Sequence, residues 1–148
     1  MRRTDREITS SEAMRLLAQA KHGVLSMIDA DGGPYAVPVN HALVDSYIII
    51  HCAVRGRKLD SVRKDARVCY TVYNVIEIDA EELTTRYTSA TAFGQAELVE
   101  DAATKRPLLE KMTERLAPDA PFICSDEMVA NTGVIRIKVD SVTGKANR

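Results

Sequence analysis

The order of apolar and polar positions divides the chain into a helical beginning, a strand-rich middle and a second helical part before a last strand. From residue 10 to Gly23 the apolar side chains are three and four positions apart, which predicts an amphipathic helix. Thr9 and Glu12 have the spacing of a capping box at its start. Residues 1–8 are charged and without a period, so we expect an extended arm on the surface or on a partner subunit.

After Gly23 the pattern is that of short β-strands separated by turns. The expected strands cover residues 24–28, 35–41, 47–52, 68–73 and 86–99, which are rich in β-branched and aromatic side chains.

Two residues within these strands mark irregular positions. Pro38 has no N–H to donate, which puts it at a sheet edge, at a bulge or facing a ligand. Gly94 suggests a bulge in the long fifth strand. Residues 75–83 place four acidic residues beside apolar ones, a pattern that fits a helix, a strand or a loop, and we expect a loop.

The last third of the chain predicts one more helix and one more strand. The helix opens at Glu100-Asp101 and ends near Leu116, with Pro107 requiring a start near Thr104 or a kink. Residues 117–132 predict a long ordered loop, and residues 133–140 alternate as a half-buried strand before a short tail. Six strands without a regular βα alternation favour a mainly β, α+β fold: a small six-stranded antiparallel barrel with flanking helices.

A cationic turn follows the third expected strand. Arg55, Arg57 and Lys58 surround Gly56, and a short helix with Leu59 on its apolar face begins at Arg57. Free N–H groups at a helix start, completed by Arg or Lys side chains, can bind a phosphate or carboxylate. Cations beside a surface turn are also often only solvated, and the residues alone leave both interpretations open.

Composition narrows the classes of protein that fit. We expect one domain over residues 1–148, and a net charge of −1 gives no reason to expect a nucleic-acid partner or an anionic membrane. Neither a membrane span nor a signal peptide is recognisable, so we expect a cytoplasmic protein. Three widely spaced cysteines suggest reduced thiols and no zinc site. No glycine-rich nucleotide motif is present.

The order and spacing of several short motifs resemble a known family. The motifs include Gly32-Gly33-Pro34-Tyr35-Ala36-Val37-Pro38-Val39-Asn40, His51-Cys52-Ala53, Gly56-Arg57-Lys58-Leu59-Asp60, Arg86-Tyr87-Thr88-Ser89, Phe93-Gly94 and Thr143-Gly144-Lys145. With them the chain resembles the flavin-binding split-barrel superfamily of pyridoxamine 5′-phosphate oxidase, and within it the nitroimidazole-resistance proteins. The resemblance implies a split barrel that binds FMN in a groove between two identical subunits.

The resemblance also assigns site residues. It implies that Arg57 and Lys58 hold the FMN phosphate, and that His51 and Cys52 touch the phosphate, ribityl chain or ring. The segment Val37, Pro38, Val39 and Asn40 would run along the edge of the isoalloxazine ring, and Tyr87 and Ser89 would reach the cofactor from the other subunit. His51 is the candidate proton source, with a satisfied strand-end histidine as the alternative.

The implied activity is an FMN-dependent reduction in which NAD(P)H supplies hydride and a small nitro-aromatic or related acceptor takes the electrons. The residues with which the oxidase itself grips pyridoxal phosphate are not recognisable, so that activity is not expected. One alternative is a non-catalytic module that binds flavin, deazaflavin or haem, with His51 or His41 as the haem ligand. Another is a structural dimer with a vestigial groove.

Overall fold

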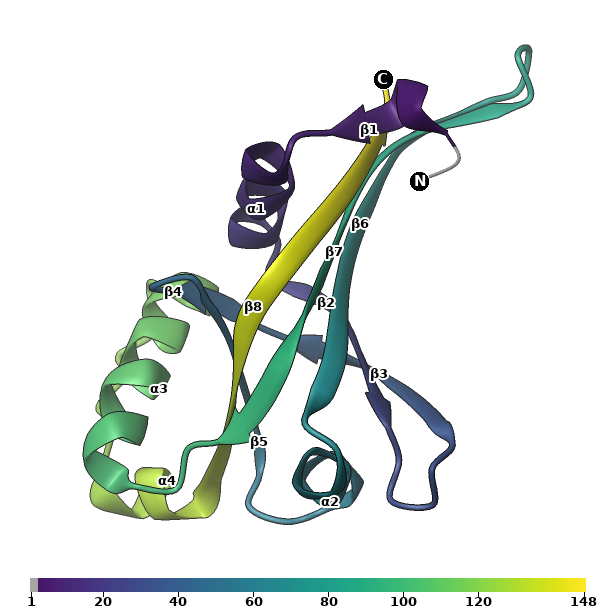
Figure 1. Ribbon diagram of the computed structural model, residues 1–148. Coiled ribbons are helices and arrows are strands. Elements are labelled where there is room, and N and C mark those ends of the chain that lie inside the picture. The colour runs from purple at the N-terminus through teal and green to yellow at the C-terminus, as the bar shows by residue number, and fades with distance from the viewer. Residues whose placement is uncertain (1–2) are drawn as a thin grey trace.

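Eight strands form one curled antiparallel half-barrel in the computed structural model, which describes residues 3–148 (Figure 1). The order across the sheet is β3-β2-β6-β7-β8-β5-β4, and β1 pairs with β8. The bounds are β1 (Glu7–Ile8), β2 (His22–Ile28), β3 (Pro34–Asn40), β4 (Ala42–Val44), β5 (Tyr47–Ala53), β6 (Arg67–Asp79), β7 (Thr84–Leu98) and β8 (Thr132–Asn147).

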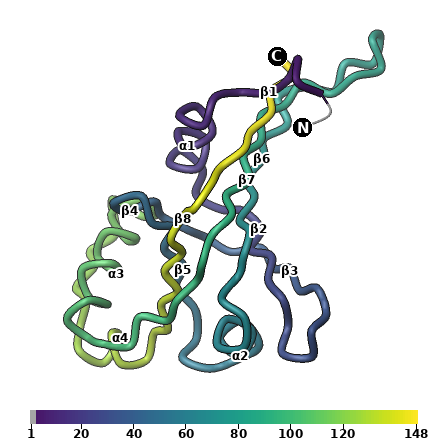
Figure 2. The backbone as a smooth tube through the Cα atoms, viewed as in Figure 1, coloured from purple at the N-terminus to yellow at the C-terminus, as the bar shows by residue number. Residues whose placement is uncertain are grey.

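Four α-helices lie around this sheet. α1 (Ser10–Gln19) packs against β7 and β8, and α2 (Arg57–Lys64) packs against β2 and β7. α3 (Ala102–Leu116) and α4 (Asp126–Asn131) lie together beside β4, β5 and the start of β8 (Figure 2). No helix within residues 3–148 has both the length and the apolar character needed to cross a bilayer.

The side chains of β5 divide between two apolar clusters because successive residues of a strand face opposite sides. Ile48 and Ile50 are buried in the main core, inside the curve of the sheet. Ile49 is buried in a second core with Met112 of α3 and Val134 of β8. β5 therefore separates the barrel interior from the layer beneath α3, and this separation decides where the site residues after Ile50 point.

All six expected strands are present, and the short strands β1 and β4 add to them. The expected bulge is confirmed, since the register of β7 and β8 shifts between Phe93 and Gly94. A Cβ built on Gly94 would lie 2.0 Å from the carbonyl oxygen of Lys138, so the close approach of the two strands requires glycine here. α3 starts at Ala102, where the Asp101 side chain caps the N–H groups of Ala103 and Thr104.

The prediction of a loop over residues 75–83 is wrong for most of that segment. β6 continues to Asp79, paired with β7, and only residues 80–83 form the turn. Arg86 of β7 explains how an acidic segment can be a strand, because its guanidinium lies 3.6 Å from a carboxylate oxygen of Glu77 and 3.3 Å from one of Asp79. The resulting hairpin projects beyond the body of the sheet (Figure 1).

Two further predictions need correction. Residues 117–132 are not all loop, because Ser125 caps α4 by accepting a hydrogen bond from the N–H of Met128. The last strand does not end at Asp140, since β8 pairs with β7 as far as Asn147. The part of the expected N-terminal arm at residues 1–2 lies outside the described residues, while Glu7 and Ile8 pair with Lys145 and Gly144 of the chain's own β8.

Candidate functional site

The cationic turn lies where β5 ends and α2 begins. Gly56 precedes the helix with a φ of +135°, a conformation that L side chains rarely adopt. Its carbonyl accepts the N–H groups of Leu59 and Asp60, and no side chain caps the helix. Among residues 3–148 the N–H groups of Arg57 and Lys58 have no acceptor, so the helix start leaves two backbone donors free.

Arg57 is held by a carboxylate and an aromatic ring. Its Nε and Nη2 atoms donate to Oδ2 of Asp29 at 2.9 and 2.5 Å, and its guanidinium carbon lies 4.3 Å from the centre of the Tyr35 ring. The Ser61 hydroxyl lies 3.0 Å from the other oxygen of Asp29. Asp29 is only 8% exposed, whereas the Arg57 side chain is 60% exposed. The Nη1 edge of Arg57 therefore remains available to a ligand.

This arrangement fixes the charge state of Asp29. Hydrogen bonds from Arg57, from the backbone N–H of Ala30 and from Ser61 lower the pKa of Asp29 to about 2, so the carboxylate is ionised at neutral pH. Part of the Arg57 charge is thus neutralised within the chain. Sequence reasoning missed both Asp29 and Tyr35, because the β2–β3 turn and α2 are adjacent only after folding.

Cys52 and His51 are neighbours in sequence but belong to opposite faces of β5. Cys52 packs against the main core, where burial raises the pKa of its thiol while the charge of Lys58 opposes the shift. His51 is exposed and lies on the side of β5 that faces α3.

His51 and Asn40 help to line a cavity of about 440 Å³, which we call the α3 cavity. Its remaining walls come from the second half of α3, from the segment 117–124, from Met128 of α4 and from Thr132 of β8. Among residues 3–148 the His51 imidazole makes no hydrogen bond. The structure therefore brings together two of the expected cofactor residues, Asn40 and His51, from the two strands in which the sequence placed them.

β3 is an edge strand of the sheet, and a sheet edge is one of the three places that the sequence allowed for Pro38. Pro38 pairs with Val24 of β2 on its inner side, and the other side of β3 is unpaired within the described chain. The side chains of Pro38 and Asn40 are exposed, whereas those of Val37 and Val39 pack on the main core. A single ligand at this edge could therefore meet all four residues only through their main chain.

Tyr87 and Ser89 lie at the other end of the molecule from α2. They pair with Asn147 and Lys145 near the C-terminal end of β8, at the top of Figure 1, while α2 lies at the bottom. One chain thus does not bring these two residues to Arg57 and Lys58.

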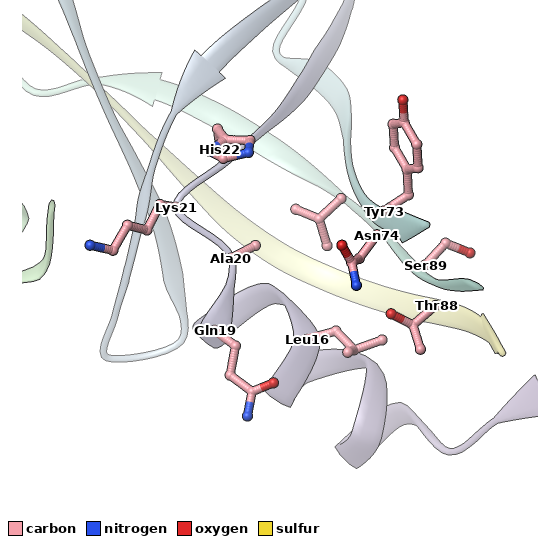
Figure 3. Close-up of a pocket in the computed structure, with 10 residues that line it drawn as sticks. Leu16, Gln19, Ala20, Lys21, His22, Tyr73, Asn74, Thr88 and Ser89 are labelled. Atoms are coloured by element: carbon pink, nitrogen blue, oxygen red, sulfur yellow. The ribbon is translucent and has the colours of Figure 1, made fainter. Parts of the chain in front are cut away.

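Ser89 lines a second cavity, of about 490 Å³. Figure 3 shows Thr88 and Ser89 of β7 on one side of this cavity and Leu16 and Gln19 of α1 on the other, while Lys21 points away from it.

The comparison with protein families decides the assignment. The family model for pyridoxamine 5′-phosphate oxidase matches residues 9–146. The chain belongs to the pyridoxamine 5′-phosphate oxidase family. A search of curated proteins finds no match.

Several solved structures have the same fold. A candidate 5-nitroimidazole antibiotic resistance protein from Bacteroides thetaiotaomicron is 26% identical, with a TM-score of 0.84 and coverage of 94% of this chain and 85% of that one. An FAD and haem binding protein from Mycobacterium smegmatis is 24% identical, with a TM-score of 0.82 and coverage of 97% and 74%. An FAD-binding protein from Mesorhizobium loti is 20% identical, with a TM-score of 0.74 and coverage of 97% and 98%.

His41 has a structural place in this family member. It is 0% exposed, its Nε2 lies 2.8 Å from the carbonyl oxygen of Leu17, and its Nδ1 lies 2.8 Å from the hydroxyl of Tyr70. Burial lowers the pKa of His41, so the ring is neutral at pH 7, with Nε2–H donating to Leu17 and Nδ1 accepting from Tyr70. Because both nitrogens are used, His41 is not available as a haem ligand, and that part of the haem alternative is wrong.

Proposed function

We propose that this protein is an FMN-dependent oxidoreductase that transfers electrons from NAD(P)H to a small nitro-aromatic or related acceptor, with FMN held in a groove between two copies of the chain. The observation that carries the proposal is the start of α2. Two free N–H groups, the positive end of the helix dipole, Lys58 and the outer edge of Arg57 meet there.

The charges at this corner suit a terminal phosphate. Asp29 offsets part of the charge of Arg57, so Lys58 and the exposed Arg55 supply the cations that are not paired within the described chain. The ring would lie along the unpaired side of β3, where backbone N–H and C=O groups can hydrogen-bond to its polar edge. Bound FMN supplies the hydride and electron chemistry, and the protein supplies binding, orientation and access.

A second copy of the chain would complete the groove. Beyond Thr71 the outer edge of β6 is unpaired within residues 3–148, because β2 pairs only with Val68–Thr71. The hairpin beyond it exposes apolar side chains, of which Ile78 is 75% and Leu83 90% exposed. Unpaired backbone next to exposed apolar side chains favours strand and side-chain contact with another chain. In such a dimer Tyr87 and Ser89 of one copy would reach the cofactor held by the other.

The choice of acceptor rests on similarity. The 26% identical structure is described as a candidate 5-nitroimidazole resistance protein, which supports a nitro-aromatic acceptor for this chain. The FAD and haem proteins are less than 25% identical and share the fold. FMN is preferred here because the cationic corner fits a single terminal phosphate.

The absorbance spectrum of freshly purified protein is the first test, because flavin, deazaflavin and haem have distinct bands. Titration of flavin-free protein then compares FMN with riboflavin, which lacks the phosphate. Lys58→Ala should weaken FMN binding about 10- to 100-fold, the effect of one lost charge-assisted contact, and leave riboflavin binding unchanged.

Lys64→Ala is the matched control, because Lys64 is exposed at the other end of α2 and its loss should change neither affinity. Equal affinity of the unaltered protein for FMN and riboflavin would refute the phosphate assignment. NADPH oxidation with a nitroimidazole that is no faster than with free FMN would refute the reductase activity and leave a binding module.

A further inference from the structure

The α3 cavity is large enough for a small organic molecule and is mostly apolar. Its volume of about 440 Å³ lies within the range of ligand pockets. Leu109, Met112 and Leu116 of α3 line it, together with Phe122 from the segment after α3 and Met128 of α4. Methionine and phenylalanine side chains adapt well to a flat ring.

The walls of this cavity are held by polar contacts behind them. The buried Lys105 of α3 donates to the carbonyl oxygen of Val129 at 3.2 Å. Arg106 donates to the carbonyl oxygen of Cys124 and pairs with Asp126. These contacts join α3 to the segment before α4 and to α4 itself, so the cavity exists before any ligand binds.

Asn40, His51, Thr113 and Thr132 are polar residues that line the α3 cavity, and the Thr113 hydroxyl already donates to the carbonyl oxygen of Leu109. Asn40 and His51 come from β3 and β5, and neither side chain makes a hydrogen bond among residues 3–148. Within the described residues 3–148, no lysine, arginine, aspartate or glutamate lines the cavity. Because an ion without a partner is costly on an apolar surface, the lining selects a neutral molecule with a polar group at one end.

From these observations we infer that the α3 cavity seats the electron acceptor, a neutral planar aromatic whose polar end meets Asn40 and His51. The inference rests on the proposed function, in which the same two residues border the flavin. It adds a location and a selectivity: neutral acceptors are preferred over anionic ones of the same shape.

The test compares 4-nitrobenzamide with 4-nitrobenzoate, which are nearly isosteric and differ in charge. NMR saturation transfer on flavin-free protein measures binding, and steady-state kinetics on flavin-loaded protein measures KM. We expect 4-nitrobenzamide to bind at least about tenfold more tightly, and Ala117→Phe, which fills the cavity rim, to raise its KM about tenfold with FMN affinity unchanged.

Ala102→Phe is the matched control, since Ala102 is exposed at the other end of α3 and does not line the cavity. Met128 is 42% exposed at the rim, so Met128→Lys is tolerated sterically and should shift the preference toward 4-nitrobenzoate. This gain of binding cannot arise from a failure to fold.

Failures of the inference and of the proposed function look different. If the protein binds FMN and reduces both acceptors, but Ala117→Phe and Met128→Lys change neither KM nor binding, the cavity is not the acceptor site while the reductase proposal stands. If FMN does not bind, the proposed function fails, and 4-nitrobenzamide that still binds flavin-free protein in an Ala117-dependent way supports the cavity as an aromatic site.

Discussion

Two buried polar contacts set the chemistry of single residues in this protein. Asp29 pairs with the guanidinium of Arg57 and offsets part of its charge, so Arg57 and Lys58 are not equivalent although they are adjacent. His41 joins α1 to β6 through Leu17 and Tyr70, and its neutrality follows from burial. Each residue therefore has a different expected response to substitution and to pH.

Protonation of His41 should make folding stability depend on pH. The pKa of His41 is lowered in the folded state, so below about pH 6.5 the unfolded chain binds the proton more readily and stability falls as the pH falls. One such proton contributes at most about 1.4 kcal/mol per pH unit. Urea denaturation at pH 7.5 and 5.5 measures this loss.

His41→Gln keeps one donor and one acceptor and removes the titration. It should lower stability at pH 7.5 and flatten the change between pH 7.5 and 5.5. His22→Gln, at an exposed histidine, should keep the slope of the unaltered protein. An unchanged slope in His41→Gln would show that other groups cause the acid sensitivity.

At the scale of elements, the pairing of β7 with β8 requires a glycine, which has no side chain, at position 94. β8 pairs with β1, β5 and β7, and it crosses β7 most closely at the bulge beside Gly94. A methyl group there cannot fit between the strands, because the nearest obstacle is backbone.

Gly94→Ala should destabilise the protein by about 2 kcal/mol or more, since the two strands must move apart to make room for a methyl group against the backbone of Lys138. Gly33→Ala is the comparison, because the Cβ would meet only the end of the Asp31 side chain, at 3.1 Å. Thermal or urea unfolding measures the loss of stability in both variants. Equal stability of the two would contradict the close approach at Gly94.

The elements also show how far sequence reasoning reaches. Apolar periodicity predicts the strands up to residue 73 and α1 to α3, because each buries a single face that the pattern reveals. It fails at residues 75–79, where the strand depends on pairing with β7 and on Arg86, and at α4, which has fewer than two turns. Such elements are stabilised by contacts distant in sequence.

The same limit applies to the site. A helix start beside Gly56 is a local signal, and the sequence revealed it. The partners Asp29 and Tyr35, and the division of His51 and Cys52 between two faces, depend on how β5 and the β2–β3 turn pack. The residues that form the α3 cavity come from segments separated by up to 92 positions, so no motif marks them.

At the scale of the whole molecule, the proposed dimer depends on the hairpin of β6 and β7. Replacing Ile78 and Leu83 together by lysine should weaken association, because like charges would face the second copy in place of apolar surface. Analytical ultracentrifugation should then show a smaller mass, and FMN binding should weaken as the partner's Tyr87 and Ser89 are lost.

Ile123→Lys is the matched control for this experiment. Ile123 is 84% exposed but lies between α3 and α4, away from the hairpin, so its replacement should leave mass and FMN affinity unchanged. A double variant that remains a dimer with full FMN affinity would show that the hairpin is not the contact.

The two ends of the sheet have a further consequence for behaviour in concentrated solution. β3 ends the sheet on one side with Pro34 and Pro38, which have no amide hydrogen, and β4 ends it on the other with three residues. Neither end is a good template for the indefinite strand addition that produces fibres. The unpaired edge of β6 beyond Thr71 belongs to an inner strand of the sheet. A second chain that pairs with this edge would form a dimer and would not extend into a polymer.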